Sequence, residues 1–364
     1  MIELPTIPTI QSPNAVSTPI LGIDLGTTHT LVSVFDAGGA RVLQGPTGES
    51  LLPSVVSFPV DGAPVVGRAA LERARLDPQR TVHSAKRLIG KGSKDLGREL
   101  ATLPYPIQDA PGRSIAMIDL GDRLLSPAEV SGHILAEARR WAATALKLPL
   151  EQVGRAVVTV PAYFDDTQRQ ATRDAAKLAG LEIVRMVNEP TAAALAYGMD
   201  KKEAEHVLIY DLGGGTFDAS LLQLKDGVFR VLATAGDTYL GGDDFDRAIM
   251  MRVANLIRQR TGKDVLADPA AKAALRIAAE RTKIALSSAE EAQFVYQDPN
   301  AGIAIRETID WRMFQEWIAP LVQRSLNCCT QVLQDAGIAP EKVDEIVLVG
   351  GSTRVPLVKA AVAQ

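Results

Sequence analysis

The fold is decided by the segment Ile209–Asp218, whose sequence is Ile-Tyr-Asp-Leu-Gly-Gly-Gly-Thr-Phe-Asp. Apolar runs over 207–210 and 217–224 predict two strands, so the three glycines lie in a tight turn between them. Without Cβ atoms, successive backbone N–H groups can point into one concavity and bind phosphate oxygens without a basic residue. Asp211 at its edge would supply the hard oxygen that Mg²⁺ prefers. An ordinary glycine-rich hairpin is the alternative explanation.

A second segment, near the other end of the chain, has the same order of features. Residues 20–32 have the sequence ILGIDLGTTHTLV: an apolar strand, Asp-Leu-Gly, small hydroxyl residues and a second apolar strand. Two copies of one phosphate hairpin in one chain indicate two related lobes that face each other across a nucleotide.

With five further segments, these hairpins resemble the ATPase domain of Hsp70 chaperones, within the actin, sugar kinase and Hsp70 superfamily. The matching segments are GIDLGTT (22–28), AKRLIG (85–90), VPAYFDDTQRQAT (160–172), NEPTAAALAYG (188–198), DLGGGTFD (211–218), LGGDDFD (240–246) and VGGSTRVP (349–356). They cover the chain from about Ile20 to its end. The resemblance implies an α/β, actin-like ATPase fold with duplicated, ribonuclease H-like lobes, each of two subdomains, around a nucleotide cleft.

The chain is long enough for two cores. With 364 residues and 46% hydrophobic content, it exceeds the size at which a single core stops growing. We expect a flexible tail over 1–19, lobe I over 20–202 with an outer subdomain at about 56–125, and lobe II over 203–364 with an outer subdomain at about 242–310. The resemblance further implies a C-terminally truncated member that lacks the substrate-binding domain.

Composition argues against several classes of function. The net charge of −4 comes from well-mixed acids and bases, without the basic stripe that nucleic acid requires. No apolar run in the first nineteen residues suits a signal or a membrane span. The two cysteines, Cys328 and Cys329, are neighbours on a predicted helix and are expected to be free thiols in a reducing compartment, and the four histidines lack zinc-ligand spacing. We expect a cytoplasmic protein with no nucleic-acid or membrane partner.

Local patterns predict alternating strands and helices, which is typical of α/β folds. The segment Ser126-Pro127-Ala128-Glu129 predicts a capping box with proline at the first helical position. Expected strands are 52–58, 155–160, 181–187, 227–235 and 343–349, with a strand-rich subdomain over 90–122. Expected helices are 69–76, 81–89, one that begins after Ser126, 165–180, 269–288 and 310–336, with a final helix after 350–354.

Two residues receive catalytic roles from the resemblance. Lys86 matches the family lysine that reaches the γ-phosphate and the attacking water, although its pattern alone would make it a solvated helix residue. Glu189 follows a strand and opens a helix, where α/β folds place ligands. It matches a glutamate that acts on Mg²⁺; an acid favoured by the helix dipole is the alternative.

The resemblance also implies that the remaining candidates bind ATP or ADP and its ions. The residues expected to hold Mg²⁺, largely through water, are Asp24, Glu189 and Asp211. K⁺ is a further candidate ion. Asp211, Thr216 and Asp218 would orient the attacking water. The candidates around the phosphates are Gly26, Thr27, Thr28, Gly213, Gly214, Gly215 and Thr216. The candidates around the adenosine and α-phosphate are Glu280, Lys283, Ser287, Gly350, Gly351 and Arg354. Further nucleotide-binding candidates are Gly241, Gly242 and Ser352. The alternative interpretation, from their i, i+3 spacing alone, is that Glu280 and Lys283 form an exposed pair on one face of the helix.

The implied activity is Mg²⁺-dependent hydrolysis of ATP to ADP and phosphate, which needs positioning and charge neutralisation. The implied partners are a J-domain co-chaperone, a nucleotide exchange factor and client polypeptides bound by the missing C-terminal domain, with a role in protein folding. Segments 317–322 and 352–358 also resemble the bacterial branch that serves iron–sulfur cluster assembly. A small-molecule kinase and an actin-like scaffold remain as alternatives, but Lys86 and segment 188–198 favour the chaperone motor.

Overall fold

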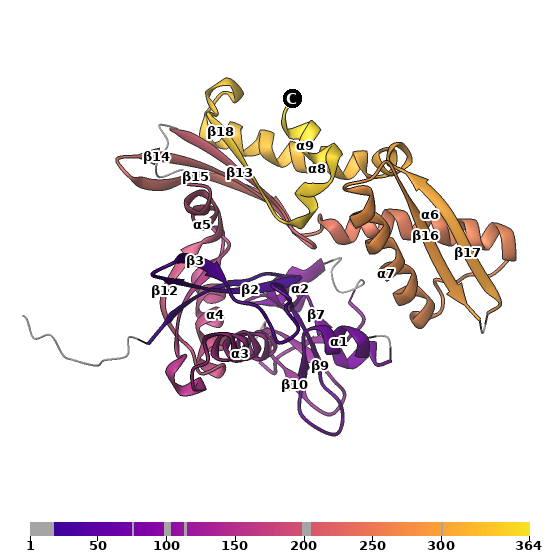
Figure 1. Ribbon diagram of the computed structural model, residues 1–364, viewed down its shortest axis with the longest axis horizontal. Coiled ribbons are helices and arrows are strands. Elements are labelled where there is room, and N and C mark those ends of the chain that lie inside the picture. Colours follow the sequence, from indigo (N-terminus) through magenta and orange to yellow (C-terminus); the bar gives the residue numbers. More distant parts are fainter. Residues whose placement is uncertain (1–17, 75, 98–102, 113–114, 199–204, 300) are drawn as a thin grey trace, which may run out of the picture.

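The structure is a computed structural model that describes residues 18–74, 76–97, 103–112, 115–198, 205–299 and 301–364. The expected tail, apart from its last two residues, and the expected boundary between lobes near residue 202 lie outside the described residues. Figure 1 shows two lobes, one built from the N-terminal half of the chain and the other from the C-terminal half. The fold is α/β and actin-like, as predicted.

The inner part of the first lobe is one mixed sheet with strand order β12-β11-β1-β2-β3, and β4 pairs with β2. Its strands are β1 (Ile20–Leu25), β2 (His29–Asp36), β3 (Gly39–Val42), β4 (Leu52–Pro53), β11 (Arg155–Val160) and β12 (Glu182–Asn188). Strand β1 pairs antiparallel with β2 and parallel with β11. This pairing confirms the first predicted hairpin.

Helices α3 (Pro127–Leu146) and α4 (Asp166–Leu178) pack against each other beside this sheet. The predicted capping box begins α3: Ser126 Oγ accepts from the Glu129 N–H at 3.2 Å, and Glu129 Oε2 accepts from the Ser126 N–H at 2.7 Å. Helix α5 (Glu189–Ala196) follows β12 directly, which places Glu189 at the strand-to-helix junction.

The outer part of the first lobe contains two small sheets, ordered β6-β5-β7 and β10-β9-β8. Its elements are β5 (Val55–Ser57), β6 (Val65–Val66), α1 (Arg68–Arg73), η1 (Pro78–Arg80), β7 (Thr81–His83), η2 (Ala85–Leu88), α2 (Ser93–Leu96), β8 (Ile107–Asp109), β9 (Ala116–Asp119) and β10 (Leu124–Leu125). A further turn, η4 (Leu150–Gln152), precedes β11. The segment 90–122, predicted to be strand-rich, contains the short helix α2 and the strands β8 and β9, whose sheet is completed by β10.

Two predictions in this part were wrong. The expected strand 52–58 is broken at Ser54, since its first half pairs with β2 and its second half joins β7. The expected helix 81–89 begins as a strand, because the β-branched Thr81 and Val82 are buried against β5. Ser84 then takes a left-handed conformation with φ 57°, so only η2 is helical.

The inner part of the second lobe repeats the plan of the first, with strand order β15-β14-β13-β18. Its elements are β13 (His206–Leu212), β14 (Phe217–Lys225), β15 (Val228–Asp237), α8 (Trp311–Ala336), η6 (Pro340–Lys342), β18 (Glu345–Val349), η7 (Gly351–Arg354) and α9 (Pro356–Val362). Strand β13 pairs antiparallel with β14 and parallel with β18, as β1 does with β2 and β11. The duplicated hairpins therefore lie in duplicated sheets.

Alternate residues of β13 face different helices. Tyr210 and Leu212 pack into the core that contains α8, whereas Val207 and Ile209 pack with Ala194 of α5. Figure 1 shows α8 and α5 on opposite faces of this sheet. Helix α5 thus follows the first lobe in sequence and packs against strands of both lobes.

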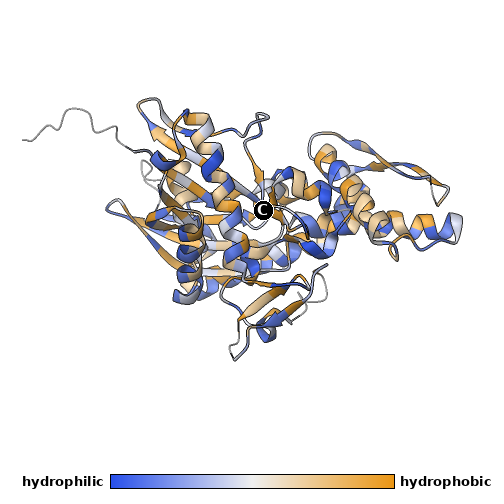
Figure 2. Cartoon of the chain, turned by 90° about the horizontal axis from the view of Figure 1, so that it is seen from below, coloured by the Kyte–Doolittle hydropathy of each residue, from blue (hydrophilic) through white to orange (hydrophobic). Residues whose placement is uncertain are grey.

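The outer part of the second lobe contains α6 (Gly242–Thr261), α7 (Pro269–Leu286) and an antiparallel pair, β16 (Glu291–Asp298) and β17 (Ile303–Asp310). The helices at 269–288 and 310–336 were predicted, but this hairpin was not. Hydrophilic and hydrophobic residues are interspersed along most helices and strands (Figure 2). Within the described ranges, no helix combines the length and apolar character needed to cross a membrane.

Candidate active site

The turns of the two duplicated hairpins touch each other. A Cβ added to Gly214 would lie 2.4 Å from Thr28 Oγ1, and one added to Gly26 would lie 2.2 Å from the His29 carbonyl oxygen. The second turn is closed by a hydrogen bond from the Gly213 N–H to the Thr216 carbonyl at 3.0 Å. Glycine is required at both positions, because a side chain on Gly214 would collide with the first turn and a side chain on Gly26 would collide with its own hairpin.

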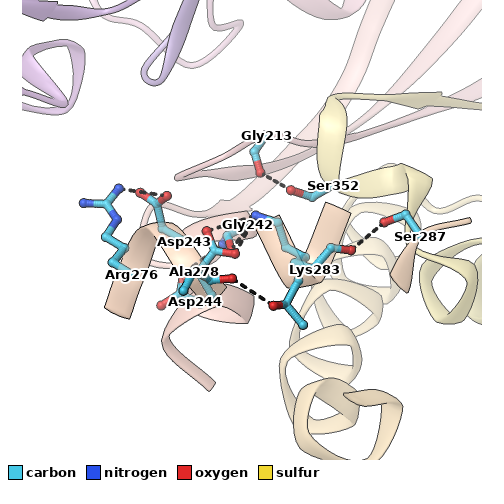
Figure 3. Close-up of polar contacts among 12 residues, drawn as sticks. Gly213, Gly242, Asp243, Asp244, Arg276, Ala278, Lys283, Ser287 and Ser352 are labelled. Carbon is cyan, nitrogen blue, oxygen red and sulfur yellow. Dashed lines mark hydrogen bonds and ion pairs between the residues drawn. The ribbon is translucent and has the colours of Figure 1, made fainter. Parts of the chain in front are cut away.

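Two further glycine segments pack around the second turn. The Gly242 N–H donates to the Gly213 carbonyl at 3.0 Å, and a Cβ on Gly241 would lie 2.6 Å from the Gly214 carbonyl oxygen. From the other side, Ser352 Oγ donates to the Gly213 carbonyl at 2.8 Å (Figure 3). Gly350 has a φ of 88°, and its Cβ would lie 2.3 Å from the carbonyl oxygen of the residue at the end of β13.

The catalytic candidates meet where these strands end. Lys86 Nζ donates to Glu189 Oε1 at 2.6 Å, and the two side chains are only 12% and 18% exposed. Asp24, at the end of β1, is exposed and accepts a hydrogen bond from Thr159 Oγ1 at 2.7 Å. Thr159 was missed from the sequence, because only the parallel pairing of β1 with β11 brings it beside Asp24.

The carboxyl groups of this site are poorly neutralised. Burial raises the pKa of Asp211 to about 7 and that of Asp218 to about 8, and the charge of Glu189 adds to both shifts. Burial also raises the pKa of Glu189, against the opposing effect of Lys86. For Lys86, burial acts to lower the pKa, but the charges of Glu189 and Asp24 outweigh it and the pKa is raised. Four acids thus lie around Lys86, and their hard oxygens suit a divalent cation such as Mg²⁺.

Those acids do not close into a direct metal site. Within the described part of the chain, no three His, Cys, Asp or Glu side chains are grouped tightly enough to ligate a metal ion. The two cysteines are free, Cys329 being buried and Cys328 partly buried. A metal among Asp24, Glu189 and Asp211 therefore fits best when waters complete its shell.

A small pocket that is partly open to solvent lies beside the lysine–glutamate pair. Its volume is about 30 Å³, which is room for about one water molecule. Lys86 and Glu189 line it from the first lobe, and Thr216 and Asp218 line it from the second. Both lobes therefore line this pocket.

Two of the adenosine candidates, Glu280 and Lys283, lie on α7, and the third, Ser287, is its C-cap residue. The three differ in their surroundings. Lys283 Nζ lies 2.9 Å from Asp246 Oδ1 and donates to the Gly242 carbonyl at 3.1 Å (Figure 3). Ser287 Oγ donates to the Lys283 carbonyl at 3.1 Å, whereas Glu280 is exposed. Spacing alone suggested that Glu280 and Lys283 form an exposed pair, and this interpretation is wrong. The Lys283 side chain instead forms an ion pair with Asp246, a residue that the sequence analysis did not single out.

The structure brings most of the predicted site residues together. The group around the two turns comprises Asp24, Gly26, Thr27, Thr28, Lys86, Glu189, Asp211, Gly213, Gly214, Gly215, Thr216, Asp218, Gly241, Gly242, Gly350 and Ser352. Glu280, Gly351 and Arg354 are exposed near its edge, on α7 and η7.

Two comparisons with known proteins show the family of this chain. The family model described as "Hsp70 protein" matches residues 20–364. Two curated relatives, both called "Chaperone protein DnaK" and both from Thermus thermophilus, one from each of two strains, are 43% identical to this chain over 350 residues. The match covers 94% of this chain and 56% of each relative, so the chain spans little more than half their length. On this evidence the chain belongs to the Hsp70 family.

Proposed function

We propose that this chain binds ATP with Mg²⁺ and hydrolyses it to ADP and phosphate, as the ATPase part of an Hsp70-type chaperone. The observation that carries the proposal is the meeting of the two glycine turns beside the Lys86–Glu189 pair. Hsp70 family members are ATPases, and the chain covers the corresponding part of the relatives.

Each part of the site has a role in this mechanism. Backbone N–H groups of the turns at 26–28 and 213–216 hold the β- and γ-phosphates. Mg²⁺, held through water by Asp24, Glu189 and Asp211, would neutralise charge on the phosphate oxygens, and K⁺ is a further candidate ion. Thr159 fixes the Asp24 carboxylate by its hydrogen bond.

The reaction would take place at the cavity shared by the lobes. Thr216, Asp211 and Asp218 orient a water for attack in line with the departing ADP, and Lys86 stabilises the charge that develops on the transferred phosphoryl group. Glu189 holds the Lys86 ammonium at 2.6 Å. We propose that the residues at 20–202 and 203–364 act as the two lobes, and that their relative movement is the useful output.

The cellular role follows from the family. We propose that the relative movement of the two lobes controls polypeptide binding and assists protein folding in the cytoplasm. The proposed partners are a J-domain co-chaperone, a nucleotide exchange factor and client polypeptides. The family match and the DnaK relatives support a chaperone role in general.

The test is phosphate release by the purified chain, with ATP and either Mg²⁺ or EDTA. Lys86→Ala should retain nucleotide binding within a few-fold and lower turnover by roughly 10²- to 10³-fold, as expected for a group that acts in the transition state. Lys94→Ala is the matched control, because Lys94 is an exposed lysine of the same subdomain. Turnover by Lys86→Ala at the parental rate would refute the assigned role. Transfer of phosphate to an added sugar would show a kinase instead.

A further inference from the structure

A glutamine of α4 reaches from the inner part of the first lobe to the segment that carries Lys86. Gln168 is buried, and its Nε2 donates to the Ile89 carbonyl at 3.2 Å. Ile89 is the C-cap residue of η2, and its own N–H donates to the Lys86 carbonyl at 3.4 Å. Two successive hydrogen bonds thus connect the Gln168 side chain to the backbone of Lys86.

The same side-chain amide also closes the first turn of α4. Gln168 Oε1 accepts from the Asp165 N–H at 3.2 Å, and the Gln168 N–H donates to Asp165 Oδ1 at 2.8 Å, which makes a capping box. Because Oε1 faces an N–H group and Nε2 faces a carbonyl, the two partners fix the orientation of the amide. The capping box therefore holds the amide in place for its bond to Ile89.

The backbone after Ile89 lies directly on the first turn of α4. Gly90 has a φ of 70°, and a Cβ added to it would lie 2.6 Å from Gln168 Cγ and 3.2 Å from the Gln168 backbone nitrogen. A residue with a side chain would push this segment away from α4. Ile89 is itself buried, so loss of the Gln168 amide would leave a buried carbonyl without this partner.

Gln168 also lies at the site of the proposed reaction. It lines the same pocket as Lys86, Glu189 and Thr216. Lys86 belongs to η2 in the outer part of the first lobe, whereas Glu189, its ion-pair partner, begins α5. The place of the Lys86 ammonium therefore depends on how η2 is held against the inner part of the lobe, and Gln168 supplies one of the bonds that hold it.

We propose that Gln168 is a positioning residue for Lys86. Its amide holds the backbone of Lys86 where the ammonium meets Glu189 and can face the transferred phosphoryl group. Gln168 itself transfers no proton and no phosphoryl group. The two glycine turns, which bind the nucleotide, do not depend on its hydrogen bonds. This inference rests on the proposed function.

The variant Gln168→Met tests the positioning role, since it removes the amide and nearly keeps the length of the side chain. ATP affinity is measured by titration of a fluorescent nucleotide, and hydrolysis is measured in a single turnover with Mg²⁺. Turnover should fall about five- to thirtyfold while affinity stays within about threefold, because a small displacement of a group that acts in the transition state costs rate rather than binding. Equal losses of affinity and turnover would overturn the proposal.

A double variant with Lys86→Ala separates positioning from a general loosening of the site. If Gln168 acts through Lys86, then Gln168→Met should lower turnover by less than about twofold when Lys86 is already absent. A loss as large as the one in the parental background would show an effect that does not pass through Lys86, and the proposal would fall.

Two controls concern the rest of α4. Gln170→Met makes the same substitution at an exposed glutamine, and Asp165→Ala removes the capping side chain but leaves the bond from Gln168 to Ile89. Both should hydrolyse ATP within about twofold of the parental rate. If Asp165→Ala lost as much turnover as Gln168→Met, the effect would belong to the helix cap and the proposal would be wrong.

A second variant, Gln168→Glu, keeps an acceptor for the Asp165 N–H and so preserves the capping box. It places a carboxylate oxygen, instead of an N–H donor, at the Ile89 carbonyl and should lower turnover at least as much as Gln168→Met. Parental turnover by Gln168→Glu would overturn the proposal. Absence of hydrolysis by the parental chain, a result that needs none of the variants, would refute the proposed function and this inference with it.

Discussion

Replacement of Lys283 by methionine should destabilise the second lobe, and the loss should depend on pH. Lys283 is the counterion of Asp246, which is 2% exposed, and its Nζ lies 2.9 Å and 3.0 Å from the two carboxylate oxygens. Removal of one partner of a buried pair costs about 3–5 kcal/mol, because the other charge is left without compensation. For a lobe of this size that corresponds to a fall in melting temperature on the order of 10 °C.

The direction of the pH dependence follows from the pKa of Asp246. Burial raises it to about 7, the nearby charges of Asp243 and Glu280 add to the rise, and Lys283 opposes it. Because the folded pKa lies above the ordinary value, the carboxyl favours the folded state below pH 4, and this contribution is lost as pH rises toward 7. Without Lys283 the folded pKa rises further. At pH 8.5 the free energy of unfolding of the variant should therefore fall by the full amount of about 3–5 kcal/mol. At pH 5.5 it should fall by only about 1 kcal/mol, because a neutral Asp246 needs no counterion.

The measurement is urea unfolding without nucleotide, followed by tryptophan fluorescence, at pH 5.5 and 8.5. Lys272→Met is the control, because Lys272 is exposed on the same helix α7. Addition of Asp246→Asn to Lys283→Met should recover part of the loss at pH 8.5. Equal losses at the two pH values, or a double variant as unstable as the sum of the single ones, would refute the reasoning.

Three further predictions concern the candidate site. Asp211→Asn should weaken ATP binding more with Mg²⁺ than with EDTA, and equal losses by calorimetry would show a structural role in the hairpin. Gly241→Ala should reduce ATP affinity at least tenfold, because its Cβ would lie 2.6 Å from the Gly214 carbonyl oxygen; parental affinity in a fluorescent-nucleotide titration would contradict this. Thr159→Val should raise the Mg²⁺ concentration for half-maximal turnover about two- to tenfold by freeing Asp24, whereas Thr159→Ser should not.

Local signals predicted those elements whose ends are fixed by local hydrogen bonds. The capping box at Ser126 and the glycine after α8, Gly337 with φ 66°, mark helix ends through bonds within a few residues. The alternation in Glu291–Asp298 would also have shown a strand, since Ala292, Phe294 and Tyr296 are its buried residues. That signal was present and was missed.

Elements and contacts that depend on distant partners could not be predicted in this way. Thr81–His83 is a strand because β5 pairs with it, and a helical pattern does not reveal that partner. The hairpin turns were evident in the sequence, but the roles within them came from a family resemblance. The bond from Lys86 to Glu189 spans 103 residues, so only the folded chain shows that these two side chains meet.

The parallel pairing of β13 with β18 also has a consequence for synthesis on the ribosome. Strands β13, β14 and β15 form a local meander, but the partner of Val207 and Ile209 on the other edge is translated on the order of a hundred residues later. At a translation rate of about 5–20 residues per second, this strand edge remains unpaired for roughly ten seconds. The waiting edge is apolar and has unpaired backbone groups, which favours pairing with other chains. Strand β1 waits in the same way for β11. A nascent chain of this protein would therefore itself expose, twice, the kind of surface that chaperones protect.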